Sequence, residues 1–361
     1  MVIIELMAST LQPAIQGSSR VIPAEFQALI SSCGVCQFSS RSYIRVSGKD
    51  RVRWLNGMIS NNIRDLAQGA GVYGFLLNPQ GRILGDMYAL NLGESLLIAT
   101  DQEQAENILG VLRRYIIMDK VELLDVSEQW GTIAVAGPKA KEVIQRAGVE
   151  VPPLERLQFA PVMIGAIEAR LVRGDNRGVE TYEILVEGKV LTAEDAEKDL
   201  SAKRAKEYRS AIHDALVRAG ATGVSEQAWE LMRIASGIPR YGRDIRERDL
   251  PQETEQLQAL NFDKGCYIGQ EIVERIRSRG NVHRTFTGFE FQGEALPAAG
   301  AKIKANGKEV GEITSGAVLP FSGGERRVGL GYIRREAGEH GMAVLAGESS
   351  GVVTQLPFVK S

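Results

Sequence analysis

The hydrophobic and polar positions of this chain change between helical and strand periods without a regular βαβ repeat. Apolar residues at helical spacing predict helices at residues 49–60, 102–115, 137–146, 192–219, 226–234 and 265–279. Short apolar runs predict strands at residues 43–47, 72–77, 83–90, 96–99, 130–136 and 181–187. Strands 72–77 and 83–90 flank the turn sequence Asn-Pro-Gln-Gly and are expected to form a hairpin. The pattern therefore indicates an α+β body.

After residue 283 the pattern changes to short strands only. They are expected at residues 287–291, 302–304, 309–314, 327–333, 342–346 and 352–356. Asn306-Gly307, between two of them, is the strongest hairpin signal in the chain. We therefore expect a small barrel or sandwich here. The predicted divisions are an N-terminal extension (1–21), an α+β body (22–283) and a β-barrel domain (284–361).

Composition excludes several classes of protein. The chain has 361 residues, of which 44% are hydrophobic and 24% charged, and this argues against disorder. No apolar run reaches the ~18 residues that a membrane-spanning helix needs. The first residues lack the basic region of a secretory signal. The chain has a net charge of −2, so it lacks the overall positive charge that is typical of nucleic-acid binders. We expect a cytoplasmic protein with no membrane contact.

The chain has three cysteines, Cys33, Cys36 and Cys266. A small, odd number of cysteines argues against a disulfide framework. Cys33 and Cys36 have the C-x-x-C form, but a structural zinc site would need two more ligands. We expect both to be buried as small hydrophobic residues, and we expect no metal site. The chain also lacks a G-x-G-x-x-G segment after a strand and a Walker A motif.

The most informative segment lies at residues 263–271, where Cys266 is expected at the junction of a loop and a helix. The unpaired N–H groups of a helix start and nearby Lys264 would both favour a thiolate. The alternative is a buried cysteine among glycines that serve packing. Spacing alone leaves both interpretations open.

Downstream, residues 275–284 contain four arginines, including Arg275, Arg277 and Arg279, and no acid. One interpretation is an anion site, because the fork of Arg suits carboxylates and phosphates. The other is a set of cations at a helix C-terminus, where the helix dipole favours them. The sequence does not decide between the two.

Two acids interrupt otherwise apolar strands, Asp86 in 83–90 and Glu183 in 181–187. Strand alternation could simply direct them to water. A carboxylate that faces a cleft could instead exchange a proton with an amine. It could also accept two parallel N–H bonds from an amino-pyrimidine edge. Both possibilities stay open for each acid.

Lys264-Gly-Cys-Tyr-Ile-Gly-Gln-Glu271 resembles the signature of the YgfZ family of folate-binding proteins. This family is related to the glycine-cleavage aminomethyltransferase (T protein, GcvT) and to iron–sulfur maturation factors. Segments 233–242, 78–86 and 136–140 are similar to other segments of the family and occur in the expected order. The likeness runs from about residue 22 to the C-terminus.

The resemblance implies a GcvT-like α+β fold, a ring of three subdomains around a central tetrahydrofolate cavity with a C-terminal β-barrel. Gly85 replaces the first of two adjacent acids in the aminomethyltransferases, and Asp86 matches the second, near the reactive nitrogens of the folate. Residues 193–207 look like an insertion. The residues implied are catalytic Asp86 and Cys266, and folate-binding Glu183, Arg233, Tyr267, Arg275 and Arg277.

The resemblance favours a folate-binding accessory protein that supports assembly or repair of iron–sulfur proteins. Its partners would be iron–sulfur client enzymes or assembly factors. Its loss would alter tRNA modification indirectly, with no direct contact to nucleic acid. The alternative is a folate-dependent aminomethyl or methylene transferase resembling the T protein. A third option is a scaffold whose folate site is vestigial.

Overall fold

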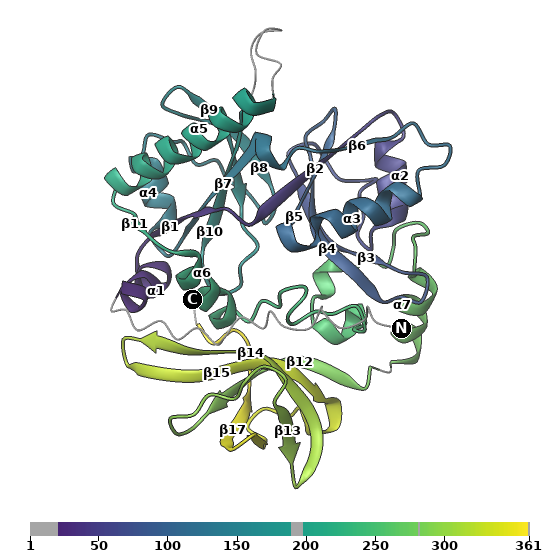
Figure 1. Cartoon of the computed structure of the whole chain (residues 1–361), viewed down its shortest axis with the longest axis vertical. Helices are drawn as coiled ribbons and strands as arrows, with labels where there is room; N and C mark the ends of the chain where they lie inside the picture. The colour runs from purple at the N-terminus through teal and green to yellow at the C-terminus, as the bar shows by residue number, and fades with distance from the viewer. Residues whose placement is uncertain (1–20, 189–197, 281, 360–361) are drawn as a thin grey trace, which may run out of the picture.

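A computed structural model of the protein describes residues 21–188, 198–280 and 282–359. Two sheets form the body, and a closed β-barrel lies below them in the view of Figure 1. The predicted α+β class with a C-terminal barrel is confirmed. Within these residues, no helix has both the length and the hydropathy needed to cross a bilayer.

A five-stranded sheet forms one half of the body. Its strands, in spatial order, are β3 (Gly71–Leu77), β4 (Ile83–Asn91), β5 (Leu96–Asp101), β2 (Arg41–Ser47) and β6 (Glu122–Asp125). Helices α2 (Arg51–Met58) and α3 (Gln102–Arg114) pack on one face. Apolar residues at helical spacing, such as Ile108 and Leu112, make that contact. The predicted hairpin with Asp86 in its second arm is confirmed as β3 and β4.

A six-stranded sheet forms the other half. Its order is β11 (Thr222–Gly223), β1 (Gly34–Phe38), β7 (Trp130–Ala136), β10 (Thr181–Glu187), β9 (Ile167–Arg173) and β8 (Phe159–Ile164). Helices α4 (Ala140–Arg146) and α5 (Lys198–Arg218) cover one face. The chain leaves this sheet after β1, builds the five-stranded sheet and returns at β7, so two connections join the sheets.

The barrel closes in the order β12 (Arg284–Phe291), β15 (Gly324–Arg334), β14 (Lys308–Phe321), β13 (Lys302–Ala305), β16 (Ala343–Ala346) and β17 (Ser349–Thr354). The predicted turn at Asn306-Gly307 is confirmed between β13 and β14. Helices α1 (Val21–Ser31) and α6 (Glu226–Ala235) share an apolar core with the barrel. Short 3-10 helices lie at Ser127–Gln129, Pro251–Thr254, Leu257–Ala259 and Arg335–Ala337.

Several sequence predictions need correction. The helix expected at 265–279 was wrong at its start, because α7 spans Gln270–Arg279. Gly269 has a φ of 83° and lies against the turn of the β3–β4 hairpin, where an added Cβ would be 2.7 Å from the Asn78 carbonyl oxygen. The helix predicted at 192–219 is α5 from Lys198 onwards, and residues 192–197 lie outside the described residues. Helix α1 and strands β1, β6, β8, β9 and β11 were not predicted.

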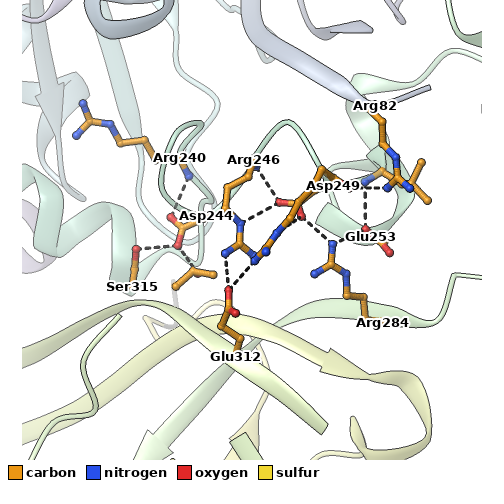
Figure 2. A network of polar contacts seen from close by, with 12 residues as sticks. Arg82, Arg240, Asp244, Arg246, Asp249, Glu253, Arg284, Glu312 and Ser315 are labelled. Atoms are coloured by element: carbon orange, nitrogen blue, oxygen red, sulfur yellow. Dashed lines mark hydrogen bonds and ion pairs between the residues drawn. The ribbon is translucent and has the colours of Figure 1, made fainter. Parts of the chain in front are cut away.

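Buried carboxylates tie the barrel to the body (Figure 2). Asp249 accepts a hydrogen bond from Arg284 of β12 at 2.7 Å. Asp244 accepts hydrogen bonds from the hydroxyls of Thr314 and Ser315 of β14, at 2.5 and 2.7 Å. We call Asp244 and Asp249 with these partners the barrel clamp. It fixes the barrel relative to the two sheets.

Candidate functional site

Asp86 and Glu183 lie on the faces by which the two sheets meet. Met87 and Ala89 of β4 are buried in the cluster with α2 and α3, and the alternation of the strand places Asp86 and Tyr88 on the opposite face. On β10, Glu183 shares a face with Leu185, which packs in the apolar cluster between the sheets. Strand alternation thus directs both acids towards the junction of the sheets. Of the two interpretations, the structure favours a shared site over simple exposure to water.

Asp86 is held by side chains from two neighbouring elements. Its Oδ2 accepts a hydrogen bond from the Tyr73 hydroxyl of β3 at 2.7 Å. Its Oδ1 accepts one from the Gln104 amide of α3 at 2.6 Å. Each carboxylate oxygen therefore has one donor in the chain and keeps a further lone pair for another.

The environment of Asp86 favours retention of a proton. Burial raises the pKa of the Asp86 carboxyl above its ordinary value, and the charge of Asp101 adds to this. The hydrogen bonds from Tyr73 and Gln104 and the charge of Arg41 oppose the shift without cancelling it. A carboxyl group with a raised pKa can exchange a proton with an amine closer to neutral pH.

Glu183 forms an ion pair with Arg41, the first residue of β2. The Oε1 atom of Glu183 lies 3.4 Å from the Nη2 atom of Arg41. The two side chains are 29% and 18% exposed, so the pair is open on one side. The Arg41 guanidinium also lies 5.9 Å from the ring centre of Tyr88. Burial raises the pKa of Tyr88, and the charges of Arg41, Glu183 and Asp86 all act on it. Asp86 shares a face of β4 with Tyr88, and Arg41 lies between Tyr88 and Glu183, so these four side chains occupy one neighbourhood.

Aromatic rings line the same neighbourhood. The rings of Tyr73 and Tyr88 are 5.1 Å apart. A cavity of about 110 Å³ borders Tyr73 and is also lined by Asn61, Arg156 and Gln258. Carboxylates with unused lone pairs beside aromatic faces suit a flat heterocycle that carries N–H groups.

A second cavity, of about 730 Å³, lies between the body and the barrel and is lined by Arg177, Arg326 and residues 354–359.

Arg233, expected beside the folate, makes its contacts within the chain. Its guanidinium donates to both oxygens of Glu230, each at 2.8 Å, and to Asp244 at 2.8 Å. It also donates to the Ile238 carbonyl and to Ser315 at 3.2 Å. These contacts use all five N–H groups of an arginine. Their geometry indicates a structural role at the barrel clamp.

The segment around Cys266 alternates between buried and exposed side chains. Lys264 is 5% exposed and donates to the carbonyl oxygens of Asn56, Ile59 and Asn61 at 2.6, 2.7 and 2.5 Å. Cys266 is exposed, so the interpretation as a buried cysteine was wrong. The expected helix start at Cys266 was also wrong, because α7 begins at Gln270.

Tyr267 is buried against the β3–β4 hairpin, in the apolar cluster that contains Tyr73. Burial raises the pKa of Tyr267 to about 12. Its hydroxyl has no hydrogen-bond partner among the described residues. This orphaned hydroxyl is available to a ligand or water that reaches it.

Arg275 and Arg277 are exposed on α7, which Figure 1 shows at the outer margin of the body, beyond β3 and β4. Arg277 lies 3.6 Å from Glu274 and 4.4 Å from the ring centre of Phe262. The structure therefore does not bring these arginines together with Asp86 and Glu183. The buried residue of α7 is Val273, and Ile268 precedes the helix.

Cys33 and Cys36 are buried, as predicted. Burial raises the pKa of each thiol to about 12, which makes both poor nucleophiles. In the described parts of the chain, no three His, Cys, Asp or Glu side chains are grouped to hold a metal ion.

Sequence reasoning did not identify Arg41, Tyr73 or Gln104. Tyr73 and Gln104 lie 13 and 18 residues from Asp86, and Arg41 lies 142 residues from Glu183. A polar residue at a helix start and an arginine before a strand are too common to attract notice. Only the packing of α3 on its sheet and of the two sheets against each other brings Gln104 and Arg41 to the two acids.

The chain is similar to known proteins of one family. The family model of the GCVT N-terminal domain matches residues 8–196. An aminomethyltransferase of Rubrobacter xylanophilus is 27% identical, over 94% of this chain and 86% of its own length. A putative chloroplastic transferase of Arabidopsis thaliana is 26% identical, over 90% of this chain and 71% of its own length.

Among solved structures, the glycine cleavage system aminomethyltransferase T of Bartonella henselae has a similar fold. The TM-score is 0.78 at 21% sequence identity, over 94% of this chain and 90% of the other. This similarity confirms the expected GcvT-like fold. Because the family model covers more than half of the sequence, the chain belongs to the family defined by the GCVT N-terminal domain.

Proposed function

We propose that this protein binds tetrahydrofolate between its two sheets and takes part in folate-dependent transfer of an aminomethyl or methylene group. The observation that carries the proposal is the convergence of Asp86 and Glu183 from opposite sheets beside Tyr73 and Tyr88. Relatives named aminomethyltransferase, which align over most of the chain, support it.

Glu183 is suited to hold the pterin ring. Its carboxylate is 29% exposed and has one partner at 3.4 Å, Arg41, so it retains acceptor capacity. Two parallel N–H groups of an amino-pyrimidine edge match a carboxylate in number and direction. The ion pair with Arg41 holds the Glu183 carboxylate in place while that edge binds.

Asp86 is suited to act on an amine nitrogen. The free lone pairs of its carboxylate can accept an N–H bond from the ligand, and its raised pKa allows it to take up and return a proton. Bound tetrahydrofolate would supply the nitrogens that carry the one-carbon unit.

Other residues have less direct roles in this proposal. The orphaned hydroxyl of Tyr267 could accept or donate a hydrogen bond at the edge of the site. Arg275 and Arg277 are exposed cations suited to the glutamate tail of a folate or to an acidic partner surface.

The test is turnover of an aminomethyl donor on a lipoyl carrier protein to methylenetetrahydrofolate. We expect the unsubstituted protein to be active and Asp86→Asn to lose activity by at least about 100-fold, the lower range for a general acid–base group. Thermal unfolding of the variant shows whether it is folded. Absence of turnover by the unsubstituted protein, or full activity of folded Asp86→Asn, would refute the proposal.

A second candidate function is support of iron–sulfur protein assembly or repair, with effects on tRNA modification through iron–sulfur enzymes. The observation that favours it is the exposure of Cys266 between buried Lys264 and Tyr267, which presents a thiol to a partner. The test is iron–sulfur enzyme activity in cells that carry Cys266→Ala. Reduced activity would support this role, and normal activity would remove the claim for the thiol.

A further inference from the structure

Gln104 contacts both the main chain and the carboxylate of Asp86. It lies near the start of α3 and is 5% exposed. Its Oε1 accepts a hydrogen bond from the Asp86 N–H at 3.0 Å, and its Nε2 donates to Oδ1 at 2.6 Å. The reverse orientation of the amide would set two donors against each other and two acceptors against each other. The main-chain contact therefore fixes Gln104 as a donor to the carboxylate.

The β4–β5 ladder ends beside this contact. Its last pair is Tyr88 with Ala99, so the main-chain groups of Asp86 lie beyond the ladder. Gln104 binds the N–H of Asp86, and the Thr100 hydroxyl donates to its carbonyl oxygen at 2.9 Å. Side chains of α3 and β5 thus bind the main-chain groups of Asp86 that lie beyond the ladder.

Gly85 leaves the space that Gln104 needs. A Cβ at this position would lie 2.9 Å from Ile108 Cγ1 and 3.1 Å from Gln104 Oε1. Any side chain at residue 85 would therefore push α3 or the Gln104 amide away from Asp86. The glycine permits a close approach of the helix to the strand.

We propose that Gln104 is the positioning residue of this site, which fixes the rotamer of Asp86 and directs its unused lone pairs towards the N–H groups of the ligand. The inference rests on the proposed function, since that function assigns a ligand to Asp86. Gln104 and Tyr73 both donate to the carboxylate, so they favour its acceptor form. The site is thereby set to bind an N–H donor, such as a protonated amine.

The test compares Gln104→Met and Gln104→Glu with a matched control, Asn107→Ala. Asn107 is also on α3, and its amide also donates to β4, to the Leu84 carbonyl oxygen at 3.0 Å, but this contact does not involve Asp86. Three measurements are made on each full-length variant. They are carbon-13 NMR titration of the Asp86 carboxyl, assigned with Asp86→Asn, the tetrahydrofolate affinity as a function of pH, and thermal unfolding.

We expect Gln104→Met to raise the pKa of Asp86 by roughly one unit, because a hydrogen bond to the charged form is lost. It should also weaken tetrahydrofolate binding by about tenfold, the equivalent of one hydrogen bond. Gln104→Glu keeps the shape and the main-chain contact, and should raise the pKa further because two carboxyl groups then share a proton. Asn107→Ala should change neither the titration nor the affinity.

An unchanged Asp86 titration in folded Gln104→Met and Gln104→Glu would overturn the inference. Equal effects of Asn107→Ala would overturn it as well, because they would show a general effect of α3 on β4. If the unsubstituted protein binds no tetrahydrofolate, the proposed function fails. The NMR titration still decides in that case whether Gln104 positions Asp86.

Discussion

Lys264 is a buried ionisable side chain and Asp86 a half-buried one, and their neighbours determine what each can do. Burial lowers the pKa of Lys264 to about 7, whereas three carbonyl oxygens at the end of α2 favour its ammonium form. These contacts use the three donors of the ammonium, so Lys264 fixes its segment to α2. Asp86 keeps lone pairs free, and so remains available to a ligand.

We expect Lys264→Met to destabilise the protein by about 3 kcal/mol, because it leaves buried carbonyl oxygens without donors. The measurement is urea-induced unfolding at neutral pH. Lys141→Met, on the exposed surface of α4, is the control and should change stability by less than about 0.5 kcal/mol. A Lys264→Met variant as stable as this control would contradict the role assigned to Lys264.

Some residues of the candidate site can be recognised from the sequence, and others cannot. Asp86 and Glu183 stand out because each is an acid in an apolar strand, and the family resemblance assigned their roles. Gln104 and Tyr73 do not stand out, because their function lies only in their contact with Asp86. Lys264 stands out in the sequence because it lies near Cys266, but its ammonium group binds carbonyl oxygens at the end of α2.

At the scale of elements, α6 joins the body to the barrel. Ser225 caps its start by accepting a hydrogen bond from the Ala228 N–H at 3.2 Å. Its last turn carries Arg233, which binds Glu230 on the same helix and Asp244 beyond it. Burial would raise the pKa of the Glu230 carboxyl, but the adjacent Arg233 and Arg243 hold it below its usual value.

Because the pKa of Glu230 is lower in the folded state, the contribution of this residue to stability depends on pH. Glu230 contributes stability above its unfolded pKa, and that stability is lost as pH falls through the lower folded value. We expect Glu230→Gln to cost about 3 kcal/mol near pH 7, as for a broken buried ion pair. The difference from the unsubstituted protein should shrink as pH falls below the unfolded pKa of a glutamate, about 4.3, and through the lower folded value. Thermal unfolding across this range measures it, and a difference independent of pH would contradict the assignment.

Element boundaries were predicted where the local signal was sufficient. Turn residues at 78–81 and 306–307 located two hairpins correctly. The start of α7 was missed because contact of Gly269 with the β3–β4 turn, remote in sequence, decides it. Strand β6 has the mostly exposed pattern of a sheet edge, so its four residues carry little apolar signal.

At the scale of the whole molecule, the path of the chain creates the site. Strand β1 belongs to the six-stranded sheet and β2 to the other, which brings Arg41 of β2 to Glu183 of β10. Hydrophobic periodicity identifies strands but carries no information on which sheet each joins. The sequence therefore predicted the α+β class and the barrel, whereas the expected ring came from the family resemblance.

The barrel clamp makes a prediction at this scale. Arg284→Met would leave the fully buried Asp249 and the nearby Glu253 without their shared partner. We expect a loss of about 3 kcal/mol and separation of barrel and body unfolding into two transitions in calorimetry. Glu290→Gln breaks a more exposed pair within the barrel, with Arg326, and should cost no more than about 1 kcal/mol. Equal effects of the two variants would contradict a special role for the clamp.

The most direct test of the proposed site is calorimetric titration of the full-length protein with tetrahydrofolate. Glu187→Gln is the matched control for Glu183→Gln, because Glu187 lies on the same strand and pairs with Arg45 of β2 at 2.9 Å. We expect saturable binding by the unsubstituted protein and by Glu187→Gln. Glu183→Gln should bind at least about tenfold more weakly, because it loses a charge-assisted bidentate contact. Absence of binding by the unsubstituted protein, or equal affinity of both variants, would contradict the account.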